Sequence, residues 1–169
     1  MKKALLLRAL LAVGILYLAI APFAPAGVGN ALYERWDGGD DEYTMLTESS
    51  PPDYTEILTS TEWGIGDDPD VDNYLARITA WIIPPVTADY IFWLVTDDNG
   101  CLWLSTDHDP ANAQLIAEET EWAGENEWGD VGDEAQSEPI TLEGGKAYWL
   151  RGGQQESAGG DHILSLIHI

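Results

Sequence analysis

The chain has 169 residues, and its 30 acidic residues far outnumber its 7 basic ones. Three of the basic residues lie within the first eight positions, so the chain after residue 31 keeps four basic residues and a net charge of −26. This charge repels phosphate backbones and anionic lipid heads, which excludes nucleic acids and acidic membrane surfaces as partners. The length fits one domain, the hydrophobic content of 45% argues against disorder, and the single cysteine, Cys101, excludes an internal disulfide.

Residues 1–31 have the layout of a secretory signal peptide. Basic residues precede an apolar run of 13 residues, Ala9–Ala21, and small residues ending at Ala26 or Ala31 supply a cleavage motif. The run is shorter than the roughly 20 residues that span a bilayer, although an uncleaved anchor remains the alternative. In both cases we expect the domain of residues 32–169 to lie outside the cytoplasm, secreted or at the cell surface.

The central part of the chain predicts short strands separated by turns. Residues 74–83 alternate between polar and apolar side chains, and residues 90–95 are apolar at every position, which is typical of a strand in the middle of a packed sheet. The turn Asp97-Asp98-Asn99-Gly100 then leads into the apolar residues 101–105. A turn cluster between two apolar runs predicts a β-hairpin.

The second half of the chain continues this pattern. Glu143-Gly144-Gly145-Lys146 separates two further apolar runs, at 140–142 and 147–150, and predicts a second hairpin. We expect short strands over 114–117 and 162–169, and long surface loops over most of the remainder. Four tryptophans on the predicted strands are expected to pack in the core or between strands: Trp81, Trp93, Trp103 and Trp149.

No window shows sustained helical periodicity, so the fold class predicted from the residues alone is all-β, an antiparallel sandwich or barrel. The chain stops inside its last predicted strand, and we therefore expect the sequence to be truncated at its C-terminus.

Four motifs in order resemble the domain named after the protective antigen of anthrax toxin, the PA-fourteen domain, also found in flocculins, adhesins and glycosidase inserts. The motifs are Ile82-Ile83-Pro84-Pro85-Val86-Thr87-Ala88-Asp89-Tyr90-Ile91-Phe92-Trp93, Thr96-Asp97-Asp98-Asn99-Gly100-Cys101-Leu102-Trp103-Leu104-Ser105-Thr106-Asp107, Pro139-Ile140-Thr141-Leu142-Glu143-Gly144-Gly145-Lys146-Ala147-Tyr148-Trp149 and Gly159-Gly160-Asp161-His162. The resemblance covers roughly Tyr33 to the C-terminus, and it implies a β-sandwich.

The resemblance also implies a calcium site. Sugar-binding members of the family hold Ca²⁺ with two consecutive aspartates joined by a cis peptide, which match Asp97 and Asp98, and the ion chelates two vicinal sugar hydroxyls. Those members add an asparagine from a later loop. No asparagine follows Asn126 in this chain, so Asp161 is the best available replacement. The alternative is that Asp97 and Asp98 form only a polar turn.

Two tryptophans in an acidic loop, Trp122 and Trp128, are candidates for stacking on a sugar ring, with loop anchoring as the alternative role. Asn99, beside the aspartate pair, is a further candidate ligand-binding residue. We found no sequence cue for a nucleophile or an acid–base pair. The sequence therefore predicts a secreted, non-catalytic, Ca²⁺-dependent carbohydrate-binding or adhesion module with a glycan partner, within a larger chain. The alternatives are a structural or assembly module and a non-catalytic glycosidase insert.

Overall fold

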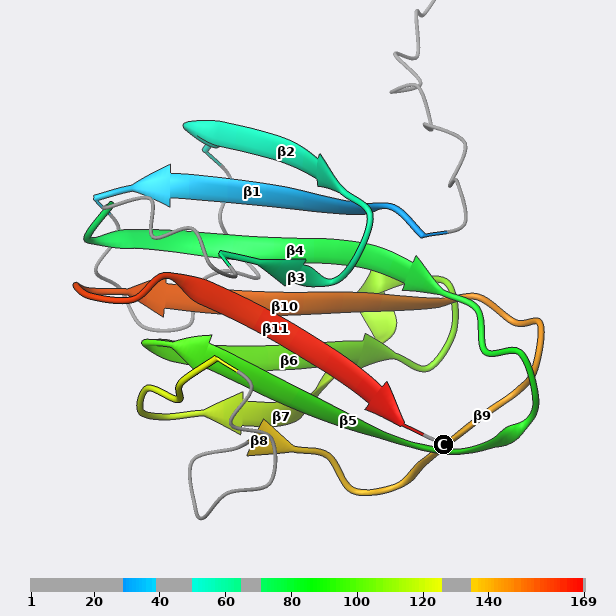
Figure 1. The fold of residues 1–169 in the computed structure, drawn as a ribbon. Coiled ribbons are helices and arrows are strands. Elements are labelled where there is room, and N and C mark those ends of the chain that lie inside the picture. The colour runs from blue at the N-terminus through cyan, green and yellow to red at the C-terminus, as the bar shows by residue number, and fades with distance from the viewer. Residues whose placement is uncertain (1–28, 39–49, 65–70, 126–134, 169) are drawn as a thin grey trace, which may run out of the picture.

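A computed structural model describes residues 29–38, 50–64, 71–125 and 135–168 of the chain. These residues form two antiparallel β-sheets packed face to face, so the prediction of an all-β sandwich is confirmed. Figure 1 shows β11 (His162–His168) and β5 (Ala88–Asp97) of one sheet crossing over β10 (Tyr148–Glu156) and β6 (Asn99–Ser105) of the other.

The larger sheet has six strands, in the order β2-β1-β4-β10-β6-β7. Its other members are β1 (Ala31–Asp37), β2 (Tyr54–Leu58), β4 (Tyr74–Ile82) and β7 (Ala113–Glu119). The smaller sheet has the order β3-β11-β5-β8, and β9 also pairs with β5. Its short members are β3 (Glu62–Trp63), β8 (Ala135–Gln136) and β9 (Ile140–Leu142), while a single 3-10 turn, η2 (Pro110–Asn112), precedes β7.

The core lies between the sheets and follows the two-residue period of the strands. Tyr74, Ala76 and Ile78 of β4 point inward, and Phe92 and Leu94 of β5 meet them from the other sheet. β5 pairs with β11 along one edge and with β8 and β9 along the other, so it is central to its sheet, as its continuous apolar run predicts.

The tryptophans expected to pack inside do not share one environment. Trp103 and Trp149 are buried, but they cluster with Leu75 and Cys101 apart from the main core, on the alternate, outward-facing positions of their strands. Trp81 is 41% exposed, so its assignment to the core is wrong. The alternation of β4 explains the difference, because Ala80 takes the inward position next to it.

Both predicted hairpins are also wrong. β5 and β6 follow each other across Asp98 but belong to different sheets, and so do β9 and β10. In each case the turn reverses the chain, and the strand that follows it joins the sheet on the other side of the core. A Cβ atom on Gly100 would overlap the side chain of Thr96, so the crossing at Asp98 is tight enough to require glycine.

The first strand that the structure describes begins at the edge of the predicted signal peptide. Ala31 is the first residue of β1, is 3% exposed and pairs with Leu58. Residues 1–28, which include the apolar run and the first cleavage motif, lie outside the described residues. The part of the chain that the structure describes contains no helix with the length and apolar character needed to cross a membrane.

Candidate functional site

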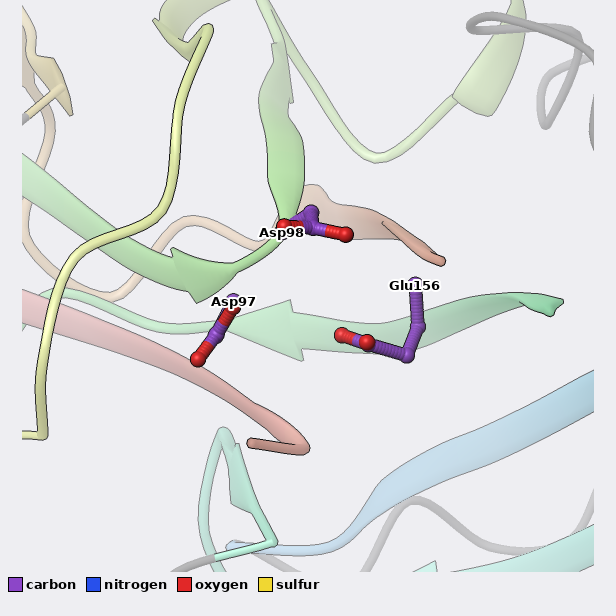
Figure 2. A group of neighbouring side chains, drawn as sticks. All are labelled: Asp97, Asp98 and Glu156. Atoms are coloured by element: carbon purple, nitrogen blue, oxygen red, sulfur yellow. The ribbon is translucent and has the colours of Figure 1, made fainter. Parts of the chain in front are cut away.

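Three carboxylates meet at the end of the sandwich where the chain crosses between the sheets. Asp97 is the last residue of β5, Asp98 follows it through a cis peptide bond, and Glu156 ends β10. One oxygen from each of the three side chains lies within 4.8 Å of the others. Figure 2 shows the Glu156 carboxylate pointing toward the two aspartates.

The register of the large sheet places Glu156 there. β10 runs antiparallel to β6 and pairs Gln155 with Asn99, so the last residue of β10 lies beside the crossing that precedes β6. The backbone N–H of Ser157 then donates a hydrogen bond to Oδ2 of Asp98, at 3.0 Å. Strand pairing therefore joins segments almost 60 residues apart in the sequence.

Glu156 is the most deeply buried of the three groups. Its side chain is 1% exposed, and neither carboxylate oxygen has a hydrogen-bond partner of normal geometry among the described residues. Burial raises its pKa to about 8, and the negative charges of Asp98, Asp161 and Asp97 contribute to the same shift. The backbone N–H of Asp98 opposes it only in part. A buried carboxylate in this state needs a proton or a cation.

Sequence reasoning missed Glu156, although the strand pattern contains a signal for it. Tyr148 and Leu150 of β10 face the core, and Gln154 and Glu156 occupy the same alternate positions. An acidic residue in the core-facing position of a central strand is rarely buried unless it is paired or binds a metal.

Asp97 shares this electrostatic environment. Burial raises the pKa of its carboxyl group, the nearby His162 opposes that shift, and Asp98 and Asp161 add to it. The backbone of Gly160 lies directly against it, because a Cβ atom at that position would be 2.7 Å from Oδ2 of Asp97. The glycine therefore leaves the space that this carboxylate occupies.

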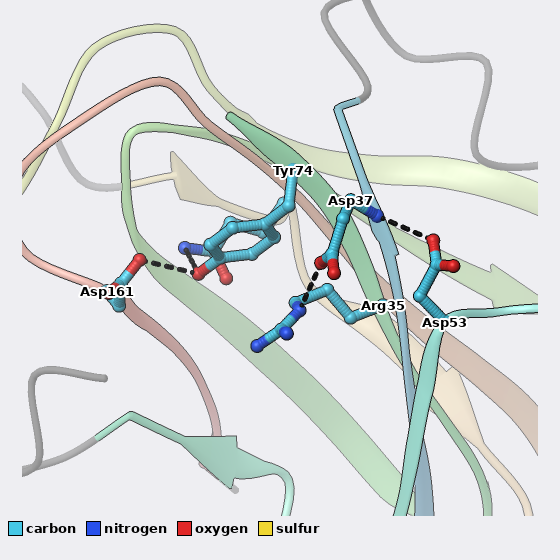
Figure 3. Close-up of polar contacts among 6 residues, drawn as sticks. Arg35, Asp37, Asp53, Tyr74 and Asp161 are labelled. Atoms are coloured by element: carbon cyan, nitrogen blue, oxygen red, sulfur yellow. Dashed lines mark hydrogen bonds and ion pairs between the residues drawn. The ribbon is translucent and has the colours of Figure 1, made fainter. Parts of the chain in front are cut away.

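Asp161 lies next to the three carboxylates but has a structural partner of its own. It is 4% exposed, and its Oδ1 accepts a hydrogen bond of 2.9 Å from the hydroxyl of Tyr74 (Figure 3). The amide of Gln154 donates both to that hydroxyl and to the backbone carbonyl of Asp97. These hydrogen bonds connect Asp161 through Tyr74 and Gln154 to the backbone of Asp97, and they hold that backbone in place. Asp161 is not among the three converging ligands, and its role as a metal ligand stays a prediction.

Arg35 lies beside Tyr74, and it forms an ion pair with Asp37. Its Nε donates to Oδ1 of Asp37 at 2.7 Å, and the guanidinium stacks 5.5 Å from the centre of the Tyr74 ring. The Asp37 backbone N–H is bound in turn by Asp53, as Figure 3 shows. Arg35 is therefore already paired with another acid.

Of the predicted sugar-stacking residues, the structure brings Trp122 toward this end of the sandwich. Trp122 is 60% exposed, and its neighbour Ala123 is fixed in place. The N–H of Ala123 donates to the carbonyl of Thr96 at 2.9 Å, and its carbonyl lies 2.8 Å from Nε2 of His162. Both partners adjoin or pair with Asp97.

Asn99 and Trp128 are the two remaining residues that the sequence predicts to bind a ligand. Asn99 is half-buried at the start of β6, one residue after the aspartate pair. Trp128 lies outside the described residues.

The three side chains fit a calcium ion. Ca²⁺ takes six to eight oxygen ligands at about 2.3–2.6 Å, so two of its ligands can lie up to roughly 5 Å apart. The 4.8 Å limit on the separation of the three oxygens meets that requirement. Three carboxylates also supply the hard, anionic donors that calcium prefers, and among the described residues the oxygens of Glu156 have no hydrogen-bond partner of normal geometry that would compete with an ion.

The opposite end of the sandwich carries two hollows of a different character. One, of about 260 Å³, lies beside the Glu143–Lys146 ion pair, and the other, of about 240 Å³, is lined by apolar residues that include Pro84 and Ile167. Neither brings carboxylates together as the crossing at Asp98 does.

Comparison with known proteins supports the β-sandwich fold. No family model matches the chain. The chain is 31% identical over 143 residues to mouse N-acetyl-beta-glucosaminyl-glycoprotein 4-beta-N-acetylgalactosaminyltransferase 1; the match covers 78% of this chain. It covers 13% of the length of that relative.

Solved structures that share the fold include the following two. The beta-glucosidase of Kluyveromyces marxianus in complex with glucose matches 82% of this chain and 15% of its own, with a TM-score of 0.55 and 15% identity. The Epithelial Adhesin 9 A domain of Candida glabrata in complex with Galβ1-4GlcNAc matches 82% of this chain and 81% of its own, with a TM-score of 0.53 and 8% identity. These likenesses are consistent with a sandwich of the protective-antigen type.

The pKa of Glu156 predicts a specific pH dependence for the metal-free protein. Its value of about 8 lies above the ordinary 4.5, so between these values the folded chain holds a proton that the unfolded chain has lost. Stability in EDTA should therefore fall as the pH rises from 5 to 8. Glu156→Gln should remove this loss and raise Tm at pH 8. Removing an uncompensated buried charge should raise the free energy of unfolding by about 1–3 kcal/mol. For a domain of this size, Tm rises by about 3 °C for each kcal/mol.

Thermal unfolding followed by circular dichroism at pH 5 and pH 8 measures this effect. The control is Glu138→Gln, which removes a charge from an exposed residue and should leave the pH profile unchanged. A Glu156→Gln profile that matches the unsubstituted protein would show that Glu156 is not held in an uncompensated state.

Gly160→Ala tests the placement of Asp97. The new methyl group would displace only the far end of the Asp97 side chain, so we expect the fold and Tm to persist while calcium affinity falls at least tenfold. Isothermal titration calorimetry with CaCl₂ gives the affinity. Unchanged calcium binding in a folded Gly160→Ala protein would exclude Asp97 Oδ2 from the site.

Proposed function

We propose that this protein is a non-catalytic carbohydrate-binding module of the protective-antigen type, and that it binds Ca²⁺ through Asp97, Asp98 and Glu156. The observation that carries the proposal is the Glu156 carboxylate, which is buried with no hydrogen-bond partner of normal geometry among the described residues and points toward two further carboxylates. The cis peptide between the aspartates agrees with the family resemblance.

Two observations support carbohydrate as the proposed ligand: the ligand of a protein with the same fold, and the chemistry of the site. The Candida glabrata adhesin domain that shares this fold is in complex with Galβ1-4GlcNAc. Adhesins work at the cell surface, which supports the same location for this chain. When bound, calcium supplies open coordination positions for two neighbouring sugar hydroxyls. Trp122 contributes a large exposed ring next to Ala123, whose backbone contacts Thr96 and His162 beside Asp97, and aromatic rings stack on the apolar faces of sugars.

The spacing of the carboxylates suits a shared cation. One oxygen from each of the three side chains lies within 4.8 Å of the others, which matches the separation of ligands around a single calcium ion. The role that we propose for this group is therefore ion binding.

A second candidate is a module inside a larger carbohydrate-active enzyme. The match to the mouse N-acetylgalactosaminyltransferase favours it, because that match covers only 13% of the enzyme, and the match to the beta-glucosidase covers 15% of that chain. In this role the module positions a glycan for another domain. The two candidates share the same calcium site and differ in what the protein is attached to.

Replacing both aspartates tests the proposed function. Asp97→Ala/Asp98→Ala should abolish calcium binding in calorimetry and all calcium-dependent signals on a glycan array, because the ion loses two of its three anionic ligands. The matched control is Asp89→Ala/Glu138→Ala, which removes two exposed acids, one of them at the opposite end of β5 from Asp97.

A Trp122→Ala arm separates the two parts of the site. We expect it to weaken glycan binding about tenfold and to leave calcium affinity unchanged, while Trp81→Ala, at another exposed tryptophan, should change neither. Equal array signals in calcium and in EDTA, together with no calcium heat, would overturn the proposal.

A further inference from the structure

We infer that Glu156 makes this site a charge filter, which accepts glycans without an anionic group near the chelating hydroxyls and rejects sialylated, sulfated or phosphorylated ones. The inference rests on the proposed function and adds the class of glycan that the site selects. It is carried by the number of carboxylates at the site and by the positions of the basic residues.

The charges at the site do not cancel when calcium is bound. Asp97, Asp98 and Glu156 carry three negative charges when ionised, and Ca²⁺ carries two positive ones, so the loaded site keeps a net charge of −1. A bound cation keeps its ligands ionised, because metal binding requires the deprotonated form. Without Glu156 the two aspartates alone would give a neutral loaded site.

The surrounding side chains do not remove this excess. Asp161 adds another buried carboxylate, and its charge acts on both Asp97 and Glu156. His162 acts on Asp97 in the opposite sense, so it offsets Asp161 and leaves the excess of the three ligands in place. Arg35 is bound to Asp37, and Arg77 is bound to Glu34 by two hydrogen bonds.

The remaining basic residues after β1 lie away from the site. Lys146 pairs with Glu143 before the start of β10, roughly 25 Å from its other end. Arg151 stacks on Trp149, with its guanidinium 4.8 Å from the ring centroid, on the outward-facing side of the large sheet. The local field at the crossing is therefore negative, as is that of the whole domain.

An anionic group on the same or the next sugar residue lies within about one Debye length of the chelated hydroxyls at 0.1 M salt. Repulsion between unit charges over such distances, partly screened by water, corresponds to about a three- to tenfold loss of affinity. A neutral sugar with the same diol pays no such penalty. The filter should weaken as salt rises, since screening shortens the reach of the field.

The experiment uses matched glycan pairs that share the diol and differ by one anionic group. Suitable probes are galactose and galactose 6-sulfate, mannose and mannose 6-phosphate, and Galβ1-4GlcNAc with and without terminal sialic acid. Binding is measured at saturating CaCl₂ in 50 mM and 500 mM NaCl. We expect a three- to tenfold preference for the neutral member at low salt and a smaller one at high salt.

Two perturbations isolate Glu156. Glu156→Gln, measured at saturating calcium, should reduce the preference at least twofold, whereas Glu138→Gln should not change it. Replacing Ca²⁺ by Tb³⁺ in the unsubstituted protein also makes the three-carboxylate site neutral and should reduce the preference to a similar extent. Independently of any glycan, Glu156→Gln should lower the ratio of Tb³⁺ to Ca²⁺ affinity measured by calorimetry.

The outcomes separate the filter from the function it rests on. Calcium-dependent binding of neutral and anionic members with equal affinity would overturn the filter and leave the binding module intact. A preference that neither Glu156→Gln nor Tb³⁺ changes would also overturn the filter alone. Absence of calcium-dependent binding to any probe would instead contradict the proposed function, and the filter with it.

Discussion

The structure concentrates unbalanced negative charge at one crossing between two sheets. Asp97 and Asp98 occupy the crossing, and the pairing of β10 with β6 fixes Glu156 beside them, where burial leaves its carboxylate without a described hydrogen-bond donor of normal geometry. Like charges this close are unfavourable unless a proton or cation joins them. This crowding of carboxylates at the crossing raises the pKa of Glu156 and underlies the proposed calcium site. Gln154 and Tyr74 hold the neighbouring groups in place by hydrogen bonds.

The sheets make this arrangement rigid. Each of the three carboxylates lies at or next to the end of a strand whose inward-facing residues belong to the core, so the site is held by packing on both sides of the sandwich. Its supporting contacts come from several strands, including Tyr74 of β4 and Asp161, which precedes β11. A binding site fixed in this way needs little reorganisation when a ligand arrives.

The sequence predicts the strands and the aspartate pair but not their topology. Continuous and alternating apolar runs locate β4, β5 and β6 well, because strand periodicity is a local property. The turns after β5 and after β9 predict hairpins, yet a turn reverses the chain equally well within one sheet or between two sheets. Whether the next strand stays in the same sheet depends on which apolar faces of the sheets must be covered. Glu156 was missed because only the register of β10 brings it to Asp98, 58 positions earlier in the chain.

The central claim, that the three carboxylates share one calcium ion, is tested most directly by a crystal structure grown in CaCl₂ with anomalous data. The account predicts one anomalous peak within about 2.3–2.6 Å of oxygens from Asp97, Asp98 and Glu156. A well-ordered crossing with no peak there, or a peak bound by other side chains while Glu156 stays unliganded, would contradict it.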